Sequence, residues 1–340
     1  FTRSVRDTPP LKFGGYLSPW DRNAKCYGTP DYNDFYIRQL TELLTNYGDI
    51  FMLWLDGACG ARADGQPVQD YDFERIWNTA VKLQPDIVMS GCAPDVRWIG
   101  NESGKTRESE WNVVPKFKYD QQNFAANSQT DDDMRKFQNR SQDVMLPDMG
   151  SREFLSGFDE FMWYPAEVDV SIRLGWFYHP LQRFTLKSLN HLMKIYYTSA
   201  GNNSLFLLNI PPNKNGLFAN SDVKRLKEMG KWLKKEDELV IKDFTRKDDQ
   251  DGFEIRLHFP KQSVDRIRLS EDTTKSQRVE KFSIYANGGK IFGGTIIGFS
   301  KIAIFEPTVT DNLTIKIEEC RKEPYINKTE VVATGAYRLK

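Results

Sequence analysis

The pattern of apolar residues changes near residue 235, and this change constrains the fold more than any other feature. Before it, short apolar runs alternate with segments whose apolar residues recur every three to four positions. Such alternation of strands and helices is typical of a parallel β/α sheet or barrel. The expected strands are 11–17, 50–55, 87–92, 158–164 and 205–210, and the expected helices are 34–47, 73–83, 186–197 and 223–235.

After residue 235 the helical spacing gives way to strict alternation of apolar and polar residues, as in Phe253–Phe259. This period is typical of an antiparallel β-sandwich. We therefore predict two domains: a β/α barrel over residues 1–235 and a β-sandwich over residues 236–340. A closed (β/α)8 (TIM) barrel has eight strands, so with five recognised we expect that the barrel lacks its first strands in this chain. The polar stretch 116–142 is expected to form a long loop.

Composition excludes several classes of protein. The chain has 47 basic and 47 acidic residues, a balance that argues against nucleic acid as a partner. Its apolar runs are too short to span a membrane. Four cysteines and three histidines are scattered along the sequence, so we expect neither a zinc site nor a histidine metal centre.

The strongest candidate for chemistry is Asp56, which follows the apolar run 50–55 and precedes a glycine. A carboxylate at the C-terminal end of a buried strand occupies the position that β/α barrels use for catalysis. Trp54 lies two residues earlier and so shares the strand face of Asp56. A carboxylate beside an indole suits a sugar ring. The alternative is that Asp56 only caps the following turn.

Glycoside hydrolysis requires a second carboxylate, which acts as an acid and a base. Glu102 is the first candidate, because it lies between two glycines in the loop that follows the strand 87–92. Glu110 is held in reserve and Glu167 is a third option. Arg97, in the same loop as Glu102, supplies a fixed cation with five hydrogen-bond donors.

Several segments, in this order, resemble glycoside hydrolase family 29, the retaining α-L-fucosidases. They are Tyr16-Leu-Ser-Pro-Trp-Asp-Arg22, Tyr32-Asn33 with Gln39-Leu-Thr-Glu-Leu-Leu44, Trp54-Leu-Asp-Gly-Ala58, Pro94-Asp-Val-Arg-Trp98 with Gly100-Asn-Glu102, Trp163–Asp169 through Trp176–His179, and Leu207-Leu-Asn-Ile-Pro-Pro212. The Gly100-Asn-Glu102 sequence is similar to the subfamily that prefers α-1,3/1,4-linked fucose.

The resemblance implies an exo-acting α-L-fucosidase that removes terminal fucose from Lewis-type glycans without a cofactor. Asp56 would be the nucleophile and Glu102 the acid/base. The sugar site would be lined by Tyr16, Trp54, Arg97 and Trp176. A secreted or periplasmic location is expected for such an enzyme, and the oligomeric state stays open.

The chain departs from the family in its histidines. The family carries a paired-histidine segment and an earlier histidine that bind the fucose hydroxyls, whereas the first histidine here is His179. We therefore expect that an N-terminal part is missing from this sequence. Two alternatives follow: a carbohydrate-binding protein without turnover on a degenerate barrel, or a hydrolase that acts on the related α-L-galactosides.

Overall fold

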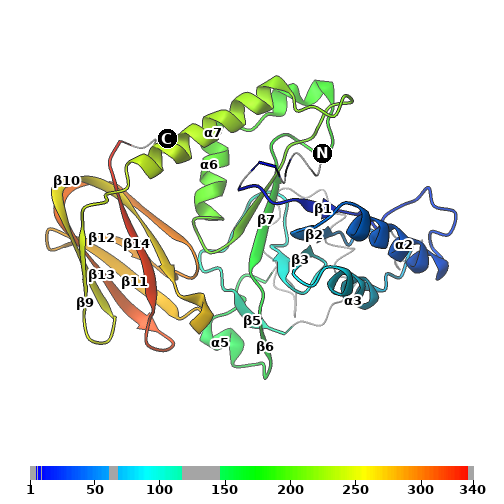
Figure 1. The fold of residues 1–340 in the computed structure, drawn as a ribbon. Coiled ribbons are helices and arrows are strands. Elements are labelled where there is room, and N and C mark those ends of the chain that lie inside the picture. The colour runs from blue at the N-terminus through cyan, green and yellow to red at the C-terminus, as the bar shows by residue number, and fades with distance from the viewer. Residues whose placement is uncertain (1–4, 6, 9, 61–67, 117–145, 336–340) are drawn as a thin grey trace. The chain divides into compact units, whose positions relative to one another are not determined.

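The computed structural model describes residues 5, 7–8, 10–60, 68–116 and 146–335 (Figure 1). The chain divides into two compact units. Unit 1 comprises Phe1–Asn101, Pro115–Pro147 and Phe158–Glu167, and unit 2 comprises Glu102–Val114, Asp148–Gly157 and Val168–Lys340. Among the described residues, no helix is both long enough and apolar enough to cross a membrane.

A six-stranded sheet of barrel type occupies the first two thirds of the chain. Its strands follow the order β1 (Gly14–Tyr16), β2 (Met52–Leu55), β3 (Val88–Gly91), β4 (Val96–Trp98), β7 (Ala166–Ser171) and β8 (Leu205–Asn209). The pairs β1–β2, β2–β3, β3–β4 and β4–β7 are all parallel. Because these pairs are parallel, their strands end at the same edge of the sheet, as in a β/α barrel. The boundary between the two units falls inside β7.

Two amphipathic helices cover the strands of unit 1 (Figure 1). Helix α2 (Asp31–Asn46) buries Tyr32, Tyr36, Leu40 and Leu44, which recur every four residues and so lie on one face. Helix α3 (Phe73–Leu83) begins where the Asp72 side chain accepts a hydrogen bond from the Arg75 amide at 3.0 Å. Both helices pack in one core cluster with Leu53 and Leu55 of β2, and this core fixes the strand that leads to Asp56.

Unit 2 contains the other helices found among the described residues. They are α5 (Arg152–Leu155), the 3-10 helix η1 (Pro180–Thr185), α6 (Leu189–Thr198), α7 (Asn220–Glu238) and the 3-10 helix η2 (Thr273–Lys275). Apolar side chains of α6 and α7 form a core cluster with Ile172 at the end of β7. A buried polar network continues it, because Arg266 Nη1 binds Glu236 Oε2 at 2.8 Å and Tyr197 Oη at 2.9 Å.

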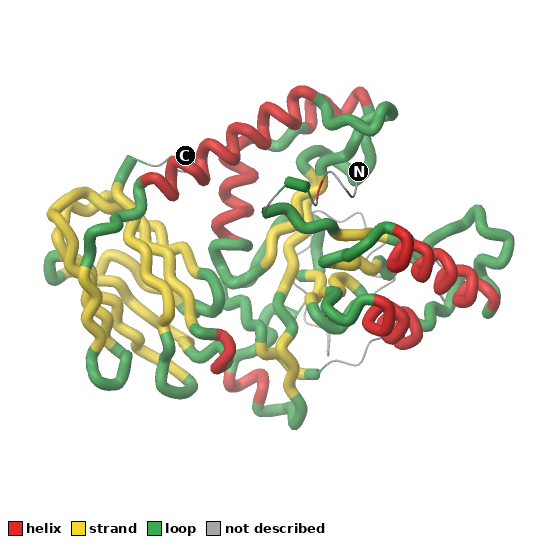
Figure 2. The backbone as a smooth tube through the Cα atoms, in the orientation of Figure 1, coloured by secondary structure: helices red, strands yellow, loops and turns green. Residues whose placement is uncertain are grey.

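The C-terminal part consists of antiparallel strands, drawn in yellow in Figure 2, and after α7 the structure describes only the short 3-10 helix η2 as helical. The strands are β9 (Thr245–Asp248), β10 (Glu254–Glu271), β11 (Val279–Ala286), β12 (Gly289–Gly294), β13 (Lys301–Cys320) and β14 (Ile326–Ala333). They pair in the order β12-β11-β13-β10-β14, and β9 pairs with the first half of β10. Register shifts interrupt the β10–β13 pairing between His258 and Gln262, and such bulges bend long strands. The inward residues form a core of their own.

The predicted fold class, a β/α barrel followed by an antiparallel β domain, is confirmed. Helix α3 has the predicted bounds of 73–83. The boundary between the two compact units falls inside β7. The change from helix to antiparallel strands comes later, between the end of α7 at Glu238 and the start of β9 at Thr245. The domain boundary at 235/236 stays a prediction. The loop predicted over 116–142 lies, apart from residue 116, outside the described residues.

One predicted barrel strand is wrong and two were missed. The run 158–164 contains only β6 (Phe161–Trp163). This strand pairs with the equally short β5 (Val113–Pro115) in a separate two-stranded sheet. The missed strands are β4 and β7. All six residues of β7 are buried although two are carboxylates, Glu167 and Asp169. Those carboxylates hide the apolar run by which a buried strand is recognised.

Candidate active site

Asp56 lies directly after β2, where the sequence predicts a catalytic carboxylate. Its Oδ1 accepts a hydrogen bond from the Ala58 amide at 2.9 Å, and its Oδ2 accepts one from the Tyr16 hydroxyl at 2.7 Å. Tyr16 ends β1 and is the register partner of Trp54 in β2, so strand pairing brings the hydroxyl to the carboxylate. The predicted nucleophile and one predicted sugar-lining residue are therefore in contact.

The Tyr16 hydroxyl acts as a donor toward Asp56. Burial of this group, and then the charge of Asp56, raise the pKa of Tyr16 far above its usual value, although about half of the residue is exposed. A phenol with a raised pKa stays protonated at physiological pH. The geometry thus fixes one carboxylate oxygen of Asp56 with a neutral donor.

Trp54 packs against Tyr16, the donor to Asp56. Its ring centroid lies 5.7 Å from that of Tyr16, with 32° between the ring planes. Its indole Nε1 donates a hydrogen bond to Glu167 Oε1 at 2.6 Å. Glu167 is buried, and burial raises the pKa of its carboxyl group. No local sequence pattern signals this bond, because the two residues are 113 positions apart.

Arg97 lies on β4 and is completely buried within unit 1. Its Nε donates to the Tyr164 carbonyl oxygen at 2.9 Å, and the Tyr164 hydroxyl donates to the Ala93 carbonyl oxygen at 2.6 Å. Arg97 therefore ties β4 to the segment before β7. A role for Arg97 in lining the sugar site stays a prediction.

Glu102 and Trp176 meet within unit 2. Trp176 Nε1 donates to Glu102 Oε2 at 2.8 Å, so the predicted acid/base and a predicted sugar-lining aromatic are in contact. Trp176 is itself held by Asn209 at the end of β8, whose side-chain Nδ2 donates to the Trp176 carbonyl oxygen at 3.0 Å. Asn209 belongs to the 207–212 segment of the resemblance, which was the signal that could have identified it.

The other candidates are placed differently. Glu110 is fully buried, and its carboxylate lies 3.2 Å from Arg107 Nη1. His179 caps η1, where its Nδ1 accepts a hydrogen bond from the Leu181 amide at 3.2 Å. Both contacts are of a kind that stabilises local structure.

The candidate site residues thus form two clusters, one in each unit. Asp56, Tyr16 and Trp54 lie in unit 1 with Glu167, and Glu102 and Trp176 lie in unit 2. Asp56 and Glu102 belong to different units, so their predicted separation of about 5–5.5 Å, typical of retaining glycosidases, stays a prediction. No group of three His, Cys, Asp or Glu side chains suited to a metal ion occurs in the described part of the chain.

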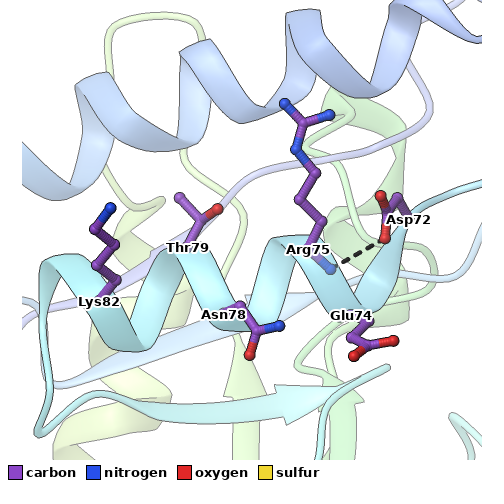
Figure 3. Close-up of a pocket in the computed structure, with 6 residues that line it drawn as sticks. All are labelled: Asp72, Glu74, Arg75, Asn78, Thr79 and Lys82. Atoms are coloured by element: carbon purple, nitrogen blue, oxygen red, sulfur yellow. Dashed lines mark hydrogen bonds between the residues drawn. The ribbon is translucent and has the colours of Figure 1, made fainter.

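A surface hollow on α3 lies apart from these residues. Figure 3 shows the side chains that line it: Asp72, Glu74, Arg75, Asn78, Thr79 and Lys82. Charges of both signs are present, and Arg75 also pairs with Asp34 of α2 at 2.6 Å. None of the predicted catalytic or sugar-lining residues borders this hollow.

The chain has a barrel-type parallel sheet, a carboxylate beside an aromatic residue after one of its strands, and a following antiparallel β domain. These features are typical of barrel glycoside hydrolases. The sequence profile named Alpha-L-fucosidase matches residues 5–238. The chain therefore belongs to the α-L-fucosidase family, glycoside hydrolase family 29.

Individual relatives agree with the family match. The chain is similar to Alpha-L-fucosidase 1 of Arabidopsis thaliana, with 40% identity over 64% of this chain and 38% of the relative. A Bacteroides ovatus crystal structure assigned to the α-L-fucosidases matches with a TM-score of 0.85 and 40% identity, over 99% of this chain and 58% of that one. A glycoside hydrolase 29 family member from a rumen bacterium gives a TM-score of 0.76 and 29% identity, over 100% and 60%. This chain therefore spans less than two thirds of the length of each of these relatives.

Proposed function

We propose that the protein is an exo-acting, retaining α-L-fucosidase that removes terminal α-linked L-fucose from oligosaccharides and glycoconjugates. The observation that carries the proposal is the cluster around Asp56 in a chain of this family. Strand pairing brings the Tyr16 hydroxyl to Asp56 Oδ2, and the ring of Trp54 packs beside that of Tyr16. Aromatic faces of this kind bind the apolar faces of sugars.

In the proposed reaction Asp56 attacks the anomeric carbon and forms a covalent fucosyl-enzyme. Glu102 donates a proton to the departing glycosidic oxygen and, as a carboxylate, then activates the water that releases fucose. The indole of Trp176 donates to Glu102 Oε2 at 2.8 Å and so orients the carboxyl group.

Contacts within unit 2 support Glu102 over Glu110 as the acid/base. The Glu110 carboxylate is buried and engaged by Arg107, and a paired, buried carboxylate cannot exchange protons with substrate and water. Glu102 is partly exposed and has an aromatic partner. Glu110 therefore belongs to the packing of this segment.

We also propose that the substrate is α-1,3/1,4-linked fucose in Lewis-type glycans, because the Gly100-Asn-Glu102 sequence is similar to the subfamily with that preference. We further propose a secreted or periplasmic location. Release of fucose from a Lewis-type trisaccharide, compared with an α-1,2-linked fucoside and an aryl α-L-galactoside, tests the sugar and the linkage. Cell fractionation tests the location. Binding of the trisaccharide without release of fucose would support the non-catalytic alternative.

The decisive variant is Asp56→Asn, for which we expect a loss of turnover of several orders of magnitude because no other group can form the covalent intermediate. Sodium azide should restore turnover of an aryl α-L-fucoside in Asp56→Ala and yield a fucosyl azide. Asp34→Asn on the surface of α2 is the matched control and should keep wild-type kcat. A kcat near that of the wild type in Asp56→Asn would contradict the proposal.

A further inference from the structure

Glu167 is a buried carboxylate that the proposed chemistry does not use. It lies on β7 in unit 1, with only 2% of its surface exposed. Strand pairing fixes its backbone, since Trp98 is its register partner and the Ile99 amide donates to its carbonyl oxygen at 3.0 Å. A buried carboxylate is destabilising unless hydrogen bonds compensate for the lost water. Its position therefore calls for a specific partner.

Trp54 is a partner that meets this requirement. Its indole N–H donates to Glu167 Oε1 at 2.6 Å, a short bond typical of a charge-assisted contact. The Trp54 ring packs against Tyr16, with centroids 5.7 Å apart, and the Tyr16 hydroxyl donates to Asp56 at 2.7 Å. Three successive contacts within unit 1 thus connect the buried carboxylate to the proposed nucleophile.

We propose that Glu167 is a positioning residue for the reaction: it fixes the Trp54 indole, and through it the Tyr16 ring, in the orientation that Asp56 requires. The inference rests on the proposed function. The rotation of a tryptophan ring about its terminal torsion is broad, so an acceptor for the indole N–H selects one orientation. A fixed orientation of Trp54 then determines where the Tyr16 hydroxyl lies.

The burial of Glu167 argues against its alternative role as the acid/base. An acid/base group must reach both the leaving oxygen and water. Glu167 is nearly inaccessible, and the indole of Trp54 occupies one of its oxygens. The side chain therefore acts on the reaction through its neighbour.

Variants that separate the hydrogen bond from the packing test the proposal. Glu167→Gln keeps a carbonyl oxygen for the indole, so kcat on an aryl α-L-fucoside should stay within about threefold of the wild type. Glu167→Leu removes the acceptor and should lower kcat by on the order of tenfold to hundredfold, with a smaller change in KM. Trp54→Phe removes the donor and should give a similar loss.

The double variant Glu167→Leu/Trp54→Phe should be no slower than the slower single variant, because both changes remove one interaction. Glu271→Gln is the matched control. Glu271 is equally buried but accepts hydrogen bonds from the amides of Gly298, Arg278 and Val279 in the β domain. This control should lower the melting temperature and leave kcat and KM unchanged.

Wild-type kcat in Glu167→Leu, with only a lower melting temperature, would overturn the inference, as would losses that multiply in the double variant. A crystal structure of Glu167→Leu supplies a readout independent of turnover. We expect the Trp54 ring to rotate and the Tyr16–Asp56 bond to lengthen or break. An unmoved Tyr16 would refute the inference even if the wild type is active, whereas an inactive wild type with a displaced Tyr16 would refute only the proposed function.

Discussion

Gly91 at the end of β3 offers the sharpest test of how the strands position Asp56. Its φ is +84°, a region that residues with a Cβ atom rarely adopt. A Cβ atom built there would overlap the backbone carbonyl oxygen of Leu55, the residue that precedes Asp56. The Cys92 amide donates to that same oxygen at 2.8 Å. Gly91→Ala must therefore displace the end of β2 or break this bond.

The expected loss has two parts. The left-handed conformation costs a residue with a Cβ atom about 1–2 kcal/mol. Forcing an extra carbon into a packed site adds about 1–3 kcal/mol, and a backbone oxygen cannot move aside as a flexible side chain can. We expect Gly91→Ala to lower the free energy of unfolding by about 2–5 kcal/mol. It should also lower kcat, because Asp56 follows the displaced strand.

Two other glycines separate these parts in the same urea denaturation experiment. Gly216 has a φ of +73° with no atom within 4 Å of the added Cβ, so Gly216→Ala should lose only about 1–2 kcal/mol. Gly230 lies inside α7 with open space around it, and Gly230→Ala should gain about 0.5–1 kcal/mol. An equal loss in Gly91→Ala and Gly216→Ala would refute the argument from the Leu55 carbonyl group.

Two further predictions concern unit 2. Arg266→Leu leaves the buried carboxylate of Glu236 without one of its cations, so it should lower the free energy of unfolding, measured in urea, by about 3–5 kcal/mol. Arg256→Leu breaks a surface pair with Glu254 and should lower it by less than about 1 kcal/mol. Similar losses in the two variants would contradict the distinction between a buried and a surface ion pair. Burial lowers the pKa of Lys301 to about 8 from an unperturbed 10.5. The unfolded chain therefore binds more protons between these values, and this lysine should make stability rise with pH from about 8 to 10.5. Lys301→Met should flatten that rise, and an unchanged slope in pH-dependent denaturation would refute the assignment.

Local patterns predicted the elements whose signals are carried by consecutive residues. Helix α3 shows the predicted bounds because an N-cap at Asp72 and a regular apolar face define it within eleven residues. The antiparallel strands followed from alternation, which one face of a sandwich requires. Strand β7 was missed for the opposite reason. Its buried carboxylates are tolerated only because of partners that no local pattern shows, such as the Trp54 indole on Glu167.

The candidate site was predictable to the same extent. Trp54 lies on β2 and Asp56 directly follows that strand, so their closeness along the chain followed from the sequence itself. The bond from Tyr16 to Asp56 required the parallel register of β1 on β2, which pairs Tyr16 with Trp54. No rule of spacing supplies that register, because a shift of one residue moves each side chain to the other face. The resemblance nevertheless named Tyr16, since a family records such pairings.

The donors around Asp56 bear on what this carboxylate can do. The two hydrogen bonds that Asp56 accepts from described residues, from the Tyr16 hydroxyl and the Ala58 amide, come from neutral groups. A neutral donor orients a carboxylate oxygen and leaves its negative charge in place, whereas a contact with a cation would hold that charge in an ion pair. Each oxygen also keeps further lone pairs free for another contact. Orientation without neutralisation is what a nucleophile requires when it attacks a carbon that acquires positive charge in the transition state. The contacts of Asp56 thus fit a nucleophile better than a turn cap, for which the Ala58 bond alone would suffice.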